Sequence, residues 1–397
     1  MSGLVFIAAA VLAAAFMAYT IGVNSNSAPI LPAVGADALS VERAAVIVGA
    51  TAALGALAQG QAVSATIGHG FVDGATVTPL ATTAALLTTA SFITLGNRSG
   101  YPIPSSFTVT GATIGAGIAL GGSLATDTLL HVVAFWLSVP LVEVVVAFGV
   151  AYVLLRTDIP DTVTVPALGT LVGAVIATVR FDFLPEDGTL AATLARALSL
   201  PRHAAPLPIP TDTTAVALSF GVVLAVTTWY AVDRHGPRGV HWFLIALGGL
   251  VTFSSGGSQI GLAIGPLQPV IEGSIGLSTL ALLGFGAACL VVGALVGAPD
   301  LIRAVADDYS DLGPYRSIAA LVPAFLVAQA AIALGFPISF NKVMICGIVG
   351  AGLVDGLDGV SEGKTGYTVA AWGVSMVAAA LVTFALYHAA ATVTGVS

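Results

Sequence analysis

Charge is scarce in this sequence: only 8% of its 397 residues are Asp, Glu, Lys or Arg, and just two are lysines. A soluble domain needs a polar shell, and a chain that is 57% hydrophobic with a mean hydropathy of +1.00 cannot supply one. With 12 Lys and Arg against 20 Asp and Glu, the net charge of -8 leaves no basic surface for a nucleic-acid partner. We therefore expect the chain to lie in a lipid bilayer.

Cysteine is equally scarce. Cys289 and Cys346 lie in apolar stretches without the spacing of metal ligands, which argues against a disulfide framework and a zinc site. The sequence shows no nucleophile–base pair or cluster of metal-ligating residues, so we expect neither an enzyme nor a cofactor. A basic start is missing too, because the chain begins Met1-Ser2-Gly3-Leu4; this favours a first membrane helix over a cleaved signal peptide.

Long apolar runs are what the sequence has in abundance. A helix needs about 20 apolar residues to cross a hydrocarbon core of roughly 30 Å, and several of the runs found here are shorter than that. About a dozen follow one another: Leu4 to Ile21, Ala44 to Ile67, Val77 to Leu95, Phe107 to Leu124, Leu129 to Leu155, Val163 to Val179, Thr213 to Val232, His241 to Phe253, Leu277 to Val296, Ala319 to Leu334, Lys342 to Val354 and Val369 to Ala391. We predict an all-α integral membrane protein, a multi-pass bundle of about 10–12 transmembrane helices in the cell membrane.

Two motifs recur in the same order at nearly the same offset. Gly100-Tyr101-Pro102-Ile103-Pro104-Ser105-Ser106 is answered 235 residues later by Gly335-Phe336-Pro337-Ile338-Ser339-Phe340-Asn341. Gly22-Val23-Asn24-Ser25-Asn26-Ser27-Ala28-Pro29 follows one apolar run, and Gly256-Gly257-Ser258-Gln259-Ile260-Gly261 follows another 234 residues later. Internal repeats with polar, Gly/Pro-interrupted segments are typical of transporters whose site lies between broken helices.

The repeats predict how the chain is organised. Residues 1–157 form a first transmembrane repeat, residues 158–238 a connector with about two transmembrane helices, and residues 239–397 a second transmembrane repeat. We expect the two repeats to be inverted relative to each other and to contain re-entrant half-helices that start at the polar motifs.

At these motifs the chain resembles the inorganic phosphate transporter (PiT) family of secondary carriers. That family has a Gly-Ala-Asn-Asp-Val-Ala-Asn type signature and a Pro-Val-Ser-Thr-Thr-His type segment in each half, and Ala263-Ile264-Gly265-Pro266-Leu267 resembles the run after its second signature. The resemblance covers nearly all of both halves. It implies an inverted-repeat fold and an ion-coupled or facilitated permease for inorganic phosphate or a similar oxyanion; a homodimer is compatible with it.

The sequence departs from the family pattern where the chemistry lies. In the first signature Ser25 stands in place of the family's Asp, and in the second the Asn and Asp positions carry Ser258 and Gln259, so both signature aspartates are replaced. The Ser-Thr-Thr-His type segments become Pro104-Ser105-Ser106-Phe107 and Ser339-Phe340-Asn341-Lys342.

Candidate anion ligands gather where the half-helices should begin. Hydroxyl groups and free backbone N–H groups at a helix N-terminus together bind a tetrahedral oxyanion. The residues at these starts are Ser105, Ser106, Thr108, Ser339 and Asn341. The alternative is that each hydroxyl only caps its helix. Lys342 could neutralise the anion directly, or it could snorkel to the membrane interface.

Coupling-ion ligands are expected at the two signatures. The neutral oxygens of Asn24, Ser25, Asn26, Ser258 and Gln259 could coordinate sodium, although less strongly than carboxylates, and these positions cannot carry a proton. Glu143 lies midway in an apolar run, where it is either a proton relay or a structural hydrogen-bonding residue. The coupling ion would thus be Na⁺ or H⁺.

Two alternatives to a phosphate permease stay open. One is a permease for another oxyanion such as sulfate. The other is a non-transporting homologue that only binds an anion, which the loss of both aspartates would favour.

Overall fold

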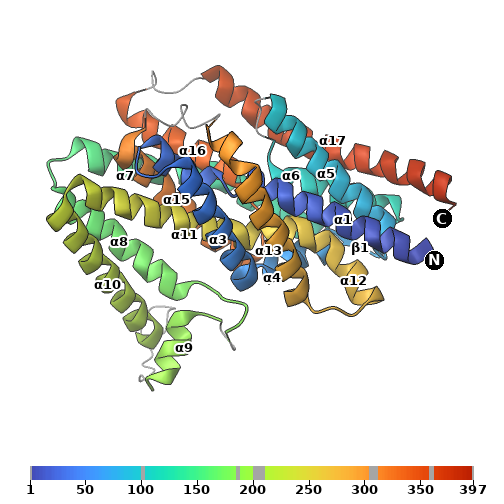
Figure 1. The fold of residues 1–397 in the computed structure, drawn as a ribbon, viewed down its shortest axis with the longest axis horizontal. Helices are drawn as coiled ribbons and strands as arrows, with labels where there is room; N and C mark the ends of the chain where they lie inside the picture. The colour runs from blue at the N-terminus through green and yellow to red at the C-terminus, as the bar shows by residue number, and fades with distance from the viewer. Residues whose placement is uncertain are drawn as a thin grey trace.

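The computed structural model describes residues 2–99, 103–184, 188–199, 211–303, 312–356 and 362–395. Gly100-Tyr101-Pro102, the beginning of the first Gly-aromatic-Pro motif, lies outside these residues. Nearly all the described elements are helices, so the all-α prediction is confirmed (Figure 1).

The elements of the first 157 residues are α1 (Ser2–Val23), the 3₁₀ helix η1 (Ala28–Ile30), α2 (Leu31–Gly35), α3 (Val41–Gln59), α4 (Gln61–His69), β1 (Val72–Asp73), α5 (Pro79–Ser99), α6 (Ser105–Ala119), β2 (Ser123–Leu124) and α7 (Thr126–Arg156). The strands β1 and β2 form one short antiparallel pair. Next come α8 (Asp161–Thr178), α9 (Leu190–Ala197) and α10 (Thr211–His235). Helices α8 and α10 pack along each other at one end of the molecule (Figure 1).

The remaining elements are α11 (Pro237–Ile264), η2 (Gly265–Leu267), α12 (Gln268–Ser274), α13 (Thr279–Val296), α15 (Gly313–Leu334), α16 (Phe340–Gly352), η3 (Leu353–Asp355) and α17 (Glu362–Thr394). Their order largely repeats that of the first part: α11, η2, α12 and α13 follow one another as α1, η1, α2 and α3 do, with a long helix, a 3₁₀ turn, a short helix and a long helix. The division into repeats and connector agrees with this order and stays a prediction.

Ten helical stretches of the described chain are long and apolar enough to cross a membrane. Helices α6 and α16 are not among them, because their 15 and 13 residues reach only about 20 Å at 1.5 Å per residue. They correspond to the runs Phe107 to Leu124 and Lys342 to Val354. The predicted number of transmembrane helices is confirmed, and these two short helices are the candidates for the expected half-helices.

Two predicted boundaries are wrong. The run His241 to Phe253 belongs to the 28-residue helix α11, which continues through the second signature instead of ending before it. Its Ser and Gln side chains are buried among other helices, so they do not need a loop. The run Ala44 to Ile67 is broken at Gly60 into α3 and α4. At this break the backbone N–H of Gln61 donates a hydrogen bond to Asp182, which lies between α8 and α9 (2.9 Å).

The two parts pack reciprocally. Helix α1 contacts α13, and α11 contacts α3 in the same manner; α6 contacts α17, and α16 contacts α7. A Cβ at Gly22 of α1 would lie 2.1 Å from the backbone oxygen of Leu290, and a Cβ at Gly256 of α11 would lie 1.9 Å from that of Ala52. Only glycine allows helix backbones to come this close, which explains the glycine in each signature. The inverted orientation of the repeats stays a prediction.

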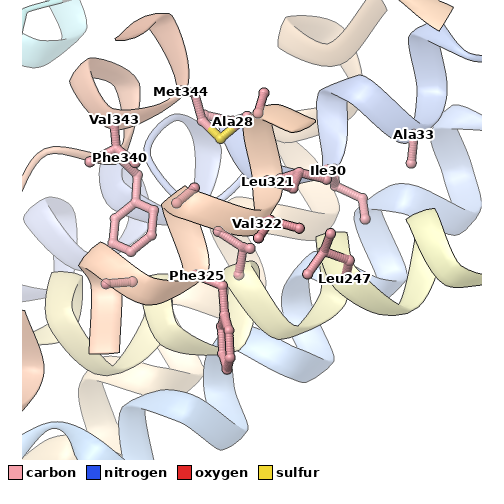
Figure 2. Packing of buried hydrophobic residues seen from close by; sticks show 14 of the residues in the cluster. Ala28, Ile30, Ala33, Leu247, Leu321, Val322, Phe325, Phe340, Val343 and Met344 are labelled. Carbon is pink, nitrogen blue, oxygen red and sulfur yellow. The ribbon is translucent and has the colours of Figure 1, made fainter. Parts of the chain in front are cut away.

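The segment after the first signature packs into the second half. Ile30 of η1 lies in a buried cluster with Leu247 of α11, Phe325 of α15 and Phe340 and Met344 of α16 (Figure 2). This packing holds the first signature beside the start of α16.

Candidate functional site

Helices α6 and α16 both begin inside the bundle, after an extended residue. Pro104 precedes α6, Ser339 precedes α16, and neither makes a side-chain capping bond. The cap interpretation is therefore wrong for Ser339. The first N–H groups of each helix have no acceptor within the helix, and they carry the positive end of its dipole.

Gln259 of α11 joins these two helix starts. Its Oε1 accepts a hydrogen bond from the Ser105 hydroxyl (2.8 Å), and its Nε2 donates to the backbone oxygen of Ile338, next to Ser339. Ser25 extends the chain of contacts, because its hydroxyl lies 3.4 Å from that of Ser105. Residues from both signatures and both helix starts are thus brought into one place.

The asparagines of the first signature make the second set of contacts. Asn341 of α16 donates from Nδ2 to Oδ1 of Asn24 (3.1 Å). Asn26 accepts from the hydroxyl of Ser255 (2.5 Å), which also lies 3.4 Å from the backbone oxygen of Ser25. The sequence interpretation missed Ser255, although it stands directly before the glycine of the second signature.

We call the following residues the polar cluster: Asn24, Ser25, Asn26, Ser105, Ser106, Ser255, Ser258, Gln259, Ser339 and Asn341. All of them are buried. The hydroxyls of Ser106, Ser258 and Ser339 have no hydrogen-bond partner in the described structure. An unsatisfied buried polar group costs about 1–3 kcal/mol, so these three hydroxyls, two of which stand at the starts of α6 and α16, point to a bound ligand.

Three predicted site residues are placed differently. The Thr108 hydroxyl donates to the backbone oxygen of Pro104 (2.9 Å) and is thereby tied to its own helix. Glu143 is fully buried on α7, and neither carboxylate oxygen has a hydrogen-bond partner among the described residues. The alternative that Glu143 makes a structural hydrogen bond is therefore not supported.

Lys342 is the third of these residues. It is only 5% exposed, its ammonium donates to the backbone oxygen of Trp136 (2.6 Å), and it lies near the rings of Phe107 and Trp372. A snorkelling lysine would reach the interface, whereas this one stays inside. These contacts are with aromatic residues rather than with the polar cluster, and the role of Lys342 in anion binding stays a prediction.

The polar cluster contains hydroxyl and amide groups without formal charge. Among the residues that the structure describes, no group of three or more His, Cys, Asp or Glu could hold a metal ion. The oxygens of Asn24, Ser25 and Asn26 include the kinds of neutral ligand that a hard cation accepts. Chemically, the cluster suits an oxyanion with many acceptors and, more weakly, a small cation.

Comparison with known proteins adds to this geometry. The model of the Phosphate transporter family matches residues 21–383. A Helicobacter pylori protein named "Putative phosphate permease" is 24% identical over 383 residues, which cover 89% of this chain and 69% of that protein. Inorganic phosphate transporter 2-1, chloroplastic, of Arabidopsis thaliana is 24% identical over 409 residues, covering 91% and 68%. The solved structure of a sodium-dependent phosphate transporter has the same fold, with a TM-score of 0.83 at 22% identity and coverage of 98% and 99%.

Proposed function

The chain belongs to the phosphate transporter family, and on this premise we propose that it is a secondary permease that binds inorganic phosphate in the polar cluster, between the starts of α6 and α16. Phosphate is the substrate that the family and its named relatives support. The place of binding is inferred from the side chains.

One observation carries this assignment: in the part of the chain that the structure describes, the hydroxyls of Ser106 and Ser339, at the starts of α6 and α16, and that of Ser258 on α11 are buried without hydrogen-bond partners. A phosphate ion has four oxygens that need donors, and hydroxyl and backbone N–H groups supply them at little cost in reorganisation. The absence of a carboxylate from the cluster removes a charge that would repel the anion.

Coupling to a cation is the finer part of the proposal. The solved structure with the same fold is that of a sodium-dependent phosphate transporter, yet the polar cluster offers a cation only neutral oxygens. Sodium binding at Asn24 and Ser25 should therefore be weak. Glu143 is buried and has no hydrogen-bond partner among the described residues, so it can take up a proton, and it is the residue to which we assign coupling.

Uptake of radiolabelled phosphate by a phosphate-transport-deficient strain tests the function. We expect Ser106→Ala and Ser339→Ala to raise the KM for phosphate by about tenfold, because a hydrogen bond to a charged group contributes ~1.5–3 kcal/mol. Ser219→Ala is the matched control, since Ser219 is exposed on α10 and bonds only to its own helix, at the backbone oxygen of Ala215.

The same assay separates the alternatives. Inhibition of uptake by excess unlabelled phosphate but not by sulfate supports phosphate as substrate, and the reverse result would indicate a sulfate permease. Phosphate binding by the purified protein without uptake into proteoliposomes would indicate a non-transporting homologue. An unchanged KM in both serine variants would show that the anion does not bind in the polar cluster.

A further inference from the structure

A cavity lies between α6, α7, α16 and α17. Its volume is about 480 Å³, within the roughly 300–1,000 Å³ of small-ligand sites. The walls are aliphatic and aromatic, with Leu137, Pro140, Ile345, Val349 and Met376 among them. No hydroxyl or amide side chain lines it in the part of the chain that the structure describes. One charged group enters it, the ammonium of Lys342.

The local backbone explains how Lys342 is held there. Pro140 has no N–H, so the carbonyl of Trp136 one helical turn earlier in α7 lacks its normal helix partner. Lys342 donates to that oxygen at 2.6 Å. Its nitrogen also lies 5.1 Å from the ring centre of Phe107 and 4.9 Å from that of Trp372. These contacts orient the ammonium but do not neutralise it.

The positive charge has no counter-ion in the described structure. None of the ion pairs that the structure describes includes Lys342. An ammonium has three N–H donors, of which the Trp136 carbonyl takes one. A buried intramembrane cation normally pairs with an anion or meets water, and these apolar walls favour the former. A ligand with one anionic head and an apolar body would meet both demands.

The cavity also has a route to the bilayer. Leu137, on its wall, is 74% exposed on the surface of α7, where a membrane helix meets lipid tails. An alkyl chain can therefore extend from the cavity into the bilayer while its head lies inside. Inorganic phosphate fits poorly here, because most of its oxygens would be buried without donors.

We propose that this cavity binds a long-chain fatty acid, with the carboxylate at Lys342 and the alkyl chain along α7 and α17. Its position next to the polar cluster has a consequence that rests on the proposed function. Phe107 follows Ser106, Lys342 follows Asn341, and Trp136 Nε1 donates to the backbone oxygen of Pro337 (2.6 Å). A bound fatty acid would contact both helix starts that hold the phosphate and would thereby alter uptake.

Tryptophan fluorescence of the purified protein in lipid nanodiscs tests the site. The chain has four tryptophans. Replacing the exposed Trp229 and Trp242 by Phe leaves Trp136 and Trp372, which line the cavity. We expect a dibrominated stearic acid to quench these two, and its methyl ester, without the charge, to need about tenfold higher concentration, or ~1.4 kcal/mol.

Variants in this background locate the head group. Lys342→Gln should weaken quenching by the acid about tenfold, and Lys342→Arg should keep most of it. Arg234→Gln is the matched control, since Arg234 also lies over an aromatic ring, that of Tyr230, but on the far helix α10. The comparison of the acid with its methyl ester uses no lysine variant. It therefore tests the role of the carboxylate even if Lys342→Gln does not fold.

Three results would overturn the proposal. Equal quenching by acid and ester would mean an ordinary lipid-filled groove, and stronger quenching by a brominated anionic phospholipid would mean a different ligand. Displacement of the acid by millimolar inorganic phosphate would mean that the cavity is part of the phosphate-binding site. Quenching does not require transport, so failure of the phosphate assay would leave this test intact.

Discussion

The two signature segments stand at matching places in the two halves but differ in their backbones. In the first half, α1 ends at Val23, and turns follow before η1; in the second half, α11 continues through Ser258 and Gln259 to Ile264. Proline cannot continue an α-helix, and Pro29 comes seven residues after Gly22, whereas Pro266 comes ten residues after Gly256. The Asn and Ser run of the first segment also prefers turns to helix interiors.

This difference has a chemical consequence. The turn after α1 presents backbone oxygens as well as side chains, as the contact between Ser255 and the Ser25 carbonyl illustrates. The carbonyls of α11 are held within its helix, so the second segment offers side chains alone. We therefore expect the first segment to be the better place for a cation and the second to organise the anion site through Gln259.

The largest effects should come where the halves agree. Gly22→Ala and Gly256→Ala each place a Cβ within about 2 Å of a backbone oxygen on the facing helix. Overpacking costs about 1–3 kcal/mol and sometimes more, so we expect poor yield or a lower Tm in detergent. Gly284→Ala on α13 is the control, because a Cβ there would meet no atom of a facing helix within 4 Å. Tolerance at only one position would show that the two helix crossings are not equivalent.

Gln259→Ala should have the next largest effect, on phosphate affinity. It removes the bonds to Ser105 and to the Ile338 carbonyl, worth roughly 1–3 kcal/mol together, so the KM should rise about tenfold or more. Ser25→Ala loses one long contact and should change the KM by less than about threefold. Gln329→Ala is the matched control, because Gln329 is a buried glutamine that bonds to Ser254 and Gln59 instead. Equal changes in KM for Gln259→Ala and Ser25→Ala would contradict the proposed difference between the two signature segments.

Coupling measurements should show a smaller dependence on sodium than on protons. Replacing sodium by choline should change initial uptake less than about threefold, because neutral oxygens hold the cation weakly. Glu143→Gln should remove the response to a pH gradient, and uptake down a phosphate gradient should persist. Strong sodium dependence that survives Glu143→Gln would instead place coupling at Asn24 and Ser25.

The smallest effect concerns the contact of the 158–238 segment with the first half. Burial raises the pKa of the Asp182 carboxyl despite the hydrogen bond from Gln61. Because the folded-state pKa lies above the unfolded value of 3.8, stability falls as pH rises from about 4 through the folded pKa. Asp182→Asn should remove this loss, a change below about 1 kcal/mol after solvent screening. Tm measured from pH 4 to 7 checks it; a parallel pH profile in both proteins would contradict it.

Much of the fold was predictable because lipid imposes simple rules. Apolar length marks the membrane helices, and the helices α6 and α16 that form in two of the apolar runs are too short to span. The extension of α11 through Gly256 and Ser258 was not predictable from hydropathy, since buried helix contacts rather than lipid surround those residues. The break at Gly60 similarly depends on a segment 121 residues away.

The candidate site was predictable in its residue types but not in its contacts. The repeated motifs indicated Ser105, Ser339 and Asn341, yet the bonds from Gln259 to both helix starts depend on how α11 crosses them. The partnership of Ser255 with Asn26 likewise arises between segments 229 residues apart.

The sequence by itself determined that this protein lies in a membrane, repeats its polar motifs and lacks carboxylates at both signatures. Composition and spacing along the chain do not depend on which residues meet in space. Only the tertiary structure decided that Asn341 meets Asn24 while Lys342, one residue further, enters an aromatic cavity. Successive residues of a helix differ by about 100° in direction, so neighbours in sequence can serve opposite sides of a helix. Which side carries the polar cluster depends on the helices packed around it.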